Sequence, residues 1–125
     1  MSVQGMNHFT VLSDDLDETR KFYCDLLGFE EGPRPNFRFP GYWLYVGDQP
    51  ILHVIHRSKL NEVRAGVIDH MAFTARGLRE AKRRLDAAGI QYALRRQVES
   101  GTWQLFCTDP NGARVELDFD AAETD

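Results

Sequence analysis

The sequence has little of what marks several large classes of protein. Its two cysteines stand alone at Cys24 and Cys107, without C-x-x-C spacing, so we expect reduced thiols in a cytoplasmic protein. There is no basic run and the net charge is −4, which argues against nucleic acid as a partner. No apolar stretch could cross a bilayer and residues 1–5 lack a signal-peptide pattern, so no membrane partner is expected.

The rest of the composition is that of an ordinary globular protein. Hydrophobic residues make up 42% of the 125 residues and charged residues 27%. A chain of this length can bury one core but not two independent ones. We therefore expect one domain over residues 1–125.

The most informative feature is a repeat. Residues 7–11 (NHFTV) reappear as 69–73 (DHMAF), so that His8 and His70 are 62 positions apart. Residues 52–55 (LHVI) reappear as 115–118 (VELD), which places Glu116 at 63 positions from His53. A duplicated unit of this kind can bring four ligand-type side chains together around a pseudo-twofold axis.

Each half has the pattern of a βαβββ module. In module one, about 5–56, a capping signal at Asp14 or Asp15 and a glycine at Gly28 delimit a helix. In module two, about 67–119, an apolar stripe ends at Gly89. The expected strands are 6–13, 37–39, 42–46 and 51–56 in the first module and 67–74, 91–98, 102–108 and 113–119 in the second. We expect a polar connector over 57–66 and a loose acidic tail over 121–125.

The alternation of side chains along the strands decides where the polar residues of the repeat point. Successive strand residues face opposite sides of a sheet, and the apolar set should pack under the helix. By this rule the three histidines and Glu116 all lie on the face away from the helices. The fold class is therefore α+β, with a concave polar surface that carries the four side chains.

Three imidazoles and one carboxylate form a ligand set for a divalent metal. This mixture of nitrogen and oxygen suits Ni, Zn, Co, Fe or Mn, and the absence of thiolates argues against a closed structural zinc site. Four protein ligands leave two positions on an octahedral ion for the vicinal oxygens of a small substrate. Glu116 could act both as a ligand and as the catalytic base that moves a proton.

The motifs together resemble the vicinal oxygen chelate superfamily, which includes glyoxalase I, extradiol dioxygenases, fosfomycin thiol transferases and bleomycin-resistance proteins. The resemblance spans nearly the whole chain and is carried by residues 7–9, 22–29, 43–45, 52–54, 69–73 and 109–117. It implies two tandem βαβββ modules that form a cupped, barrel-like mixed sheet with the helices outside. It also implies a divalent metal cofactor and, commonly, a homodimer.

The resemblance leaves the reaction open at one position. Glyoxalase I takes a metal ligand from each of the places held here by His8, His53, His70 and Glu116, although the place of His53 is usually a glutamate. Extradiol dioxygenases and fosfomycin thiol transferases resemble the triad without His53, a 2-His-1-carboxylate set that suits Fe(II). Bleomycin-resistance proteins lack metal ligands and act as binding modules.

From these patterns we predict a metal-dependent, glyoxalase-like lyase or isomerase that stabilises an oxyanion or enediolate of a small substrate. The first alternative is an Fe(II)-dependent extradiol-type dioxygenase, and the second is a non-catalytic binding or resistance protein. Candidate substrate contacts lie on strands that could line the concavity, at Arg38, Trp43, Tyr45, Arg95 and Gln104. An arginine there would suit an anionic substrate.

Overall fold

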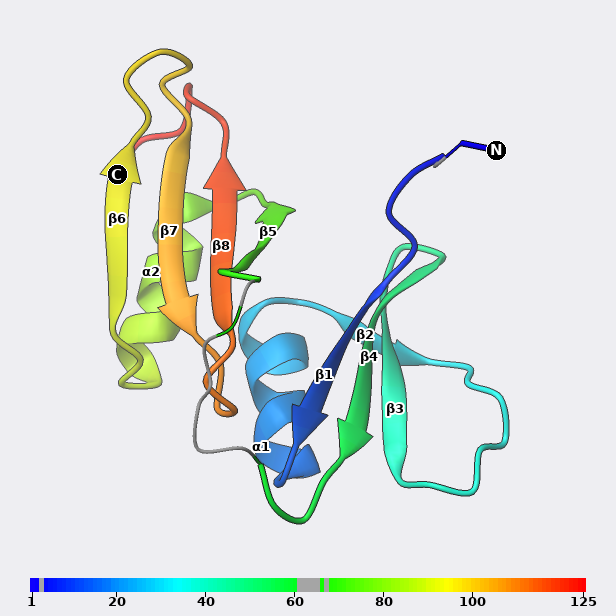
Figure 1. Ribbon diagram of the computed structural model, residues 1–125. Coiled ribbons are helices and arrows are strands. Elements are labelled where there is room, and N and C mark those ends of the chain that lie inside the picture. Colours follow the sequence, from blue (N-terminus) through cyan, green and yellow to red (C-terminus); the bar gives the residue numbers. More distant parts are fainter. Residues whose placement is uncertain (3, 61–65, 67) are drawn as a thin grey trace. The chain divides into compact units, whose positions relative to one another are not determined.

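The computed structural model describes residues 1–2, 4–60, 66 and 68–125, and the chain divides into two compact units, Met1–Asn61 and Glu62–Asp125. Each unit is a βαβββ module, as predicted (Figure 1). Part of the predicted connector, 61–65, and the predicted strand start at position 67 lie outside the described residues. That the two modules form one domain stays a prediction.

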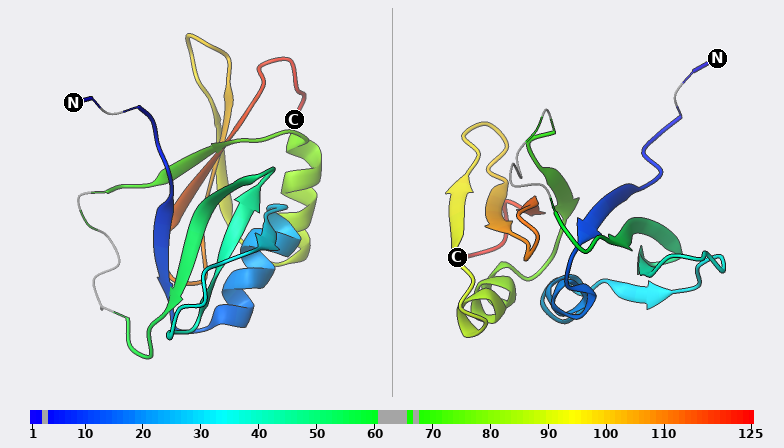
Figure 2. Two further views of the ribbon diagram at one scale, coloured as in Figure 1. Left: turned by 90° about the vertical axis from the view of Figure 1, so that its right-hand side faces the viewer. Right: turned by 60° about the horizontal axis from the view of Figure 1, so that its bottom comes forward.

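The first unit holds a four-stranded sheet in the order β1-β4-β3-β2, in which β1 and β4 run parallel and the other pairs antiparallel. Figures 1 and 2 show the helix of this unit against one face of the sheet. Its elements are β1 (Phe9–Ser13), α1 (Leu16–Arg20), a π-helical continuation η1 (Lys21–Leu26), β2 (Glu30–Gly32), β3 (Gly41–Val46) and β4 (Gln49–His56).

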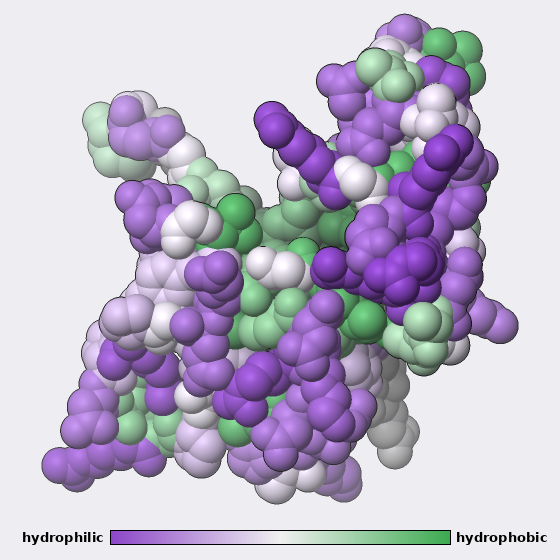
Figure 3. All heavy atoms as spheres, turned by 180° about the vertical axis from the view of Figure 1, so that it is seen from behind, coloured by the Kyte–Doolittle hydropathy of each residue, from purple (hydrophilic) through white to green (hydrophobic). Residues whose placement is uncertain are grey.

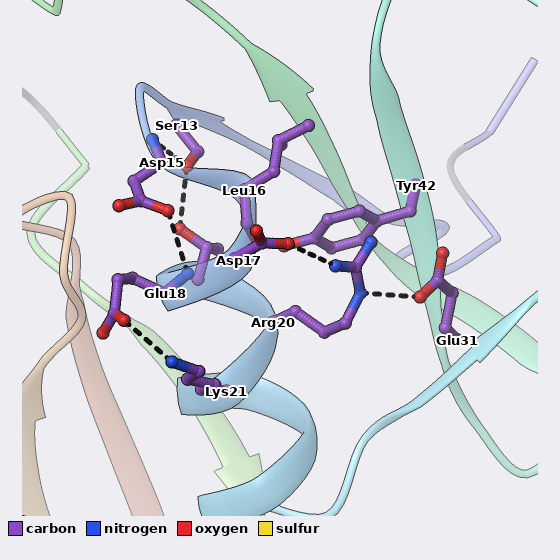
Figure 4. A network of polar contacts seen from close by, with 10 residues as sticks. Ser13, Asp15, Leu16, Asp17, Glu18, Arg20, Lys21, Glu31 and Tyr42 are labelled. Carbon is purple, nitrogen blue, oxygen red and sulfur yellow. Dashed lines mark hydrogen bonds and ion pairs between the residues drawn. The ribbon is translucent and has the colours of Figure 1, made fainter.

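The helix begins and ends at the residues that the sequence signals. The carboxylate of Asp15 accepts a hydrogen bond from the backbone N–H of Glu18, which caps an otherwise unpaired donor (Figure 4). Arg20 forms ion pairs with Asp17 on the same helix and with Glu31 on β2. Its guanidinium carbon lies 4.4 Å from the centre of the Tyr42 ring. The helix ends at Leu26 and is followed by Gly28, whose φ of 84° is the left-handed conformation that glycine adopts without strain.

One expected strand is absent, because β2 lies at Glu30–Gly32 and residues 37–39 form part of a loop. The alternation of Phe37 and Phe39 imitates a strand. Both rings instead stack on each other, with centres 5.1 Å apart, and proline at positions 33, 35 and 40 deprives the segment of backbone donors for a ladder. The prediction of a strand at 37–39 was therefore wrong.

The second unit repeats the same topology, with a sheet in the order β5-β8-β7-β6 and β5 parallel to β8. Its helix likewise lies against one face of its sheet (Figure 1). Its elements are β5 (Met71–Thr74), α2 (Leu78–Ala87), β6 (Tyr92–Arg96), β7 (Trp103–Thr108) and β8 (Arg114–Phe119). The α+β class and the βαβββ repeat are confirmed.

The acidic end of the chain is not loose, contrary to expectation. The carboxylate of Glu123 accepts hydrogen bonds from the backbone N–H groups of Gly77 and Leu78, at the start of α2. The indole of Trp103 donates to the Glu123 carbonyl, and Arg96 donates to the Ala121 carbonyl. The tail thus supplies the cap that Gly77, with no side chain, cannot give to its own helix.

The core of each unit follows the predicted alternation. In the first sheet Val11, Leu44, Leu52 and Val54 are buried, and in the second Leu105, Val115 and Phe119. Hydrophilic side chains are spread over the face seen in Figure 3, in keeping with the charged fraction of the sequence. No described helix has the length and apolar character needed to span a membrane.

Candidate metal centre

The first unit brings His8 and His53 into direct contact. His8 immediately precedes β1 and His53 lies within β4, and their rings stack with centres 3.8 Å apart. The Nδ1 atom of His8 is 2.6 Å from Oδ1 of Asn7. An amide oxygen only accepts hydrogen bonds, so this contact assigns the proton to Nδ1 and leaves the lone pair on Nε2. A metal-binding histidine is oriented in the same manner.

His53 is held differently. Its ring lies between His8 and Trp43, whose ring centre is 4.0 Å away and nearly parallel. Its Nε2 is 3.1 Å from the carbonyl oxygen of Pro50, which assigns the proton to Nε2 and the lone pair to Nδ1. Burial lowers the pKa of His53, and the charges of His8 and Arg34 lower it further against the opposing Pro50 hydrogen bond. The lowered pKa favours the neutral imidazole, the form that binds metals.

The second unit brings His70 and Glu116 together. His70 precedes β5, Glu116 lies on β8, and Nε2 of the histidine is 2.7 Å from Oε2 of the glutamate. On the other side of the ring, Nδ1 is 2.6 Å from Oδ2 of Asp69, which also accepts a hydrogen bond from Arg114. Asp69-His70 therefore repeats the arrangement of Asn7-His8. Two ligands at right angles on one divalent ion stand about 3 Å apart, so this pair fits such an ion.

Glu116 is buried and its carboxylate is fixed from the side opposite His70. The side-chain amide of Gln104, on the neighbouring β7, donates to Oε1 of Glu116 at 2.6 Å. Arg95 on β6 donates in turn to the amide oxygen of Gln104 at 3.0 Å and lies over the Phe106 ring. This chain of hydrogen bonds leaves Oε2 of Glu116 directed at His70.

Asp118 is a neighbour of this carboxylate that the sequence reasoning did not single out. It lies two residues beyond Glu116 on β8 and so shares its face of the sheet. Burial raises the pKa of Asp118, and the adjacent Glu116 carboxyl raises it further. Its Oδ1 is buried and has no hydrogen-bond partner among the described residues. The signal that could have found it is the i, i+2 spacing of two acids on one strand.

The four candidate ligands thus form two pairs, one in each unit. His8 and His70, expected within strands, precede β1 and β5, whereas His53 alternates on β4 with the buried Leu52 and Val54 as predicted. Within the described part of the chain, no three histidine, cysteine or acidic side chains lie together as a metal-binding group. A site made from all four residues stays a prediction.

A pocket of about 420 Å³ adjoins the histidine pair of the first unit. Trp43, one of the candidate substrate contacts, lines it, as do Phe37 and Phe39 from the loop before β3. Arg34 also lines it and was missed, although proline on both sides of the arginine marks an irregular segment that can carry function. Arg38 is exposed and is not among the lining residues.

The other candidate substrate contacts have partners within their own units. The hydroxyl of Tyr45 donates to the Pro33 carbonyl, which holds the ring across β2. Arg95 and Gln104 form the hydrogen-bonded chain that ends at Glu116. Contact of any of these residues with a substrate stays a prediction.

Comparison with known proteins decides the family. A family model described as the Glyoxalase/Bleomycin resistance protein/Dioxygenase superfamily matches residues 5–117. The chain belongs to this superfamily. The predicted resemblance is confirmed over almost the whole sequence.

Individual members of the superfamily are similar in sequence or in fold. Glyoxylase I 4 of Arabidopsis thaliana is 29% identical over 94% of this chain and 71% of its own length. The structure of a protein from Bacillus anthracis, provisionally assigned to the glyoxalase family, matches with a TM-score of 0.77 and 26% identity over 96% of this chain and 98% of its own. Lactoylglutathione lyase from Agrobacterium tumefaciens shares the fold, with a TM-score of 0.69 and 23% identity over 95% and 96% of the two chains.

Proposed function

We propose that this superfamily member is a metal-dependent, glyoxalase-like enzyme with a lyase or isomerase activity on a small substrate with vicinal oxygens. His8, His53, His70 and Glu116 would hold one divalent ion. The observation that carries the proposal is the buried Glu116 carboxylate, held by Gln104 with one oxygen 2.7 Å from the His70 ring nitrogen. The named relatives support it, since two of them are described as a glyoxylase and a lactoylglutathione lyase.

The chemistry supplied by a bound ion is Lewis-acid stabilisation of negative charge on the substrate oxygens. The protein side chains do the remaining work. Glu116 moves a proton at its Oε2, because Oε1 is occupied by the Gln104 amide. His8 and His70 are held by Asn7 and Asp69 through Nδ1, so Nε2 of each is already placed for the ion and neither ring has to turn.

The test is metal binding measured by calorimetry on protein stripped with a chelator. We expect one divalent ion per chain, and at least about a 100-fold loss of affinity in H8A and in E116Q, because each removes a whole ligand. H56A is the matched control, since His56 lies at the end of β4 outside both pairs. Unchanged affinity in either ligand variant contradicts the proposal.

One observation favours a second function, an Fe(II)-dependent dioxygenase. His53 presents Nδ1, whereas His8 and His70 present Nε2, and its ring is stacked between those of His8 and Trp43. If His53 does not bind the ion, the ligands are His8, His70 and Glu116, the set that suits Fe(II) and dioxygen. His53→Gln then leaves Fe(II) affinity within about threefold of the wild type, whereas a ligand loss costs far more.

Turnover of a catechol panel with and without dioxygen separates the two functions. A lyase or isomerase works equally in both conditions, whereas a dioxygenase works only in air. A third outcome, ligand binding that survives chelator treatment with no turnover at all, identifies a binding or resistance protein.

We further propose a homodimer, as is common for proteins of this fold, and its arrangement can be tested through the two ligand pairs. H8A damages the first unit and E116Q the second. If the units that share an ion belong to different chains, mixing the two variants restores one intact site per mixed dimer. If they belong to the same chain, mixing restores none. Metal affinity of the refolded mixture shows whether sites are restored, and its sedimentation shows whether the protein is a dimer.

A further inference from the structure

The pocket beside the histidine pair has an aromatic wall that is partly open to solvent. Phe37 and Phe39 are 41% and 43% exposed, and their rings are parallel within 10°. The Trp43 ring lies 6.3 Å from that of Phe37. Large apolar side chains that stay exposed next to one another in a hollow are typical of a ligand groove.

The positively charged side chain of Arg34 lies next to these rings. The guanidinium carbon of Arg34 lies 4.9 Å from the centres of both Phe37 and Phe39. Within the described residues its one hydrogen bond runs from Nη2 to the Phe39 carbonyl oxygen, so four of its five N–H donors point to no protein partner. No aspartate or glutamate is among the described residues that line the pocket.

These features determine which charge a ligand of the pocket should carry. An aromatic hollow can attract a cation, but here the guanidinium fills that role and would repel one. An anionic group can accept hydrogen bonds from Arg34, whose planar fork matches a carboxylate. The aromatic wall favours a flat ring, because aromatic pairs in contact are worth about 0.5–1.5 kcal/mol beyond the area they bury.

We propose that the pocket binds an aryl carboxylate, with the ring against Phe37 and Trp43 and the carboxylate on Arg34. The volume of about 420 Å³ is near the lower end of small-molecule sites and fits a single-ring compound. This proposal rests on the proposed function in one respect, because the guest would be the part of the substrate that lies beside His8 and His53. Arg34 then determines substrate specificity, whereas Arg38, one of the two arginines that the sequence favoured, does not.

The two tryptophans of the chain give a direct readout of binding. The indole N–H signal of Trp43 reports on the pocket, and that of Trp103, bonded to Glu123 in the other unit, reports on the rest of the protein. We expect benzoate to shift the Trp43 signal and leave the Trp103 signal in place. Benzyl alcohol and cyclohexanecarboxylate, which lack the charge and the aromatic ring respectively, should each bind about tenfold more weakly, from the worth of one charge-assisted hydrogen bond or one aromatic contact.

Substitution at Arg34 provides the matched comparison. R34Q should weaken benzoate binding about tenfold, to the level of benzyl alcohol, whereas R38Q on the same loop should not change it. R34K keeps the positive charge but lacks the planar guanidinium, so its affinity for benzoate should lie between those of R34Q and R38Q. An unshifted Trp43 signal, equal affinity of R34Q and R38Q, or equal binding of cyclohexanecarboxylate overturns the proposal. The circular dichroism spectrum of each variant shows that the fold is intact, and the Trp103 signal shows this for the second unit.

The same titration separates this inference from the proposed function. Benzoate is added first to protein stripped with a chelator and then to protein with the metal restored. Benzoate binding in protein that takes up no metal leaves the pocket proposal standing and removes the proposed enzyme. Metal uptake without benzoate binding removes the pocket proposal and leaves the proposed enzyme standing.

Discussion

At the scale of single side chains, the histidines differ in which ring nitrogen is left for a ligand. Asn7 and Asp69 hold His8 and His70 through Nδ1, which leaves Nε2 for a ligand in both. Pro50 contacts Nε2 of His53 instead. The two histidines of the repeated N/D-H motif are therefore equivalent, and His53 is the one whose participation depends on the function.

The residue-scale prediction concerns Gln104. Replacing it by methionine removes the amide that fixes Glu116, and a lost orienting partner typically costs 10- to 100-fold in metal affinity. We expect a loss in that range for Q104M, measured by calorimetry with Zn²⁺. Q91M, at an exposed position before β6, serves as the control. An affinity equal to that of the control would mean that Gln104 does not orient the ligand.

At the scale of elements, the two helices are capped by different means. The first helix uses a local signal, the Asp15 side chain, whereas α2 uses the Glu123 carboxylate from a residue 45 positions beyond Leu78. A carboxylate at a helix N-terminus satisfies unpaired N–H groups and interacts favourably with the helix dipole. The tail therefore contributes to the stability of the second unit.

Glu123→Ala tests this contribution. Loss of a capping side chain costs about 1 kcal/mol, so the free energy of unfolding from urea denaturation should fall by roughly that amount. Glu99→Ala, at an exposed position in the turn between β6 and β7, should leave stability unchanged. If both variants are as stable as the wild type, the Glu123 contacts do not stabilise α2.

The elements also show what the sequence could and could not predict. The βαβββ order and the cap at Asp15 follow from local sequence patterns. Residues 37–39 were misassigned because alternating aromatics pack on Arg34 rather than in a ladder. Glu123 was misassigned because its partners are distant in sequence, and no local pattern distinguishes a docked acidic tail from a solvated one.

At the scale of the whole molecule, the proposed function would draw on both units of the duplication. Each unit has its own core, its own helix and one pair of candidate ligands. The second pair carries the carboxylate and its supports, and the first carries the aromatic pocket. Under the proposed function, the two copies share one topology and would contribute different chemistry.

The buried thiol of Cys107 reports on the integrity of the second unit. Burial raises the pKa of Cys107 from 9.0 to about 11, and Asp109 adds to the shift. At pH 8 only about 0.1% of such a thiol is thiolate, the reactive form. Iodoacetamide should therefore label the half-buried Cys24 well before Cys107, as followed by mass spectrometry. Equal labelling rates in native protein would contradict the buried position.

The same shift has a consequence for stability. Because the folded pKa is raised, the contribution of Cys107 to stability is fully present below pH 9 and is lost as the pH rises through about 11. Cys107→Ala should therefore show a smaller loss of stability between pH 9 and 11 than the wild type, in urea titrations at each pH. A parallel pH dependence in the two proteins would contradict this linkage.

The central claim is that both units contribute ligands to one divalent ion, and one measurement tests it most directly. Calorimetric titration of chelator-stripped protein with Zn²⁺ is compared for the wild type, H8A, H70A and H56A. The account predicts one ion per chain in the wild type and in H56A, with affinity lost in both H8A and H70A. Loss in one of these two variants alone, or in neither, would contradict a shared site.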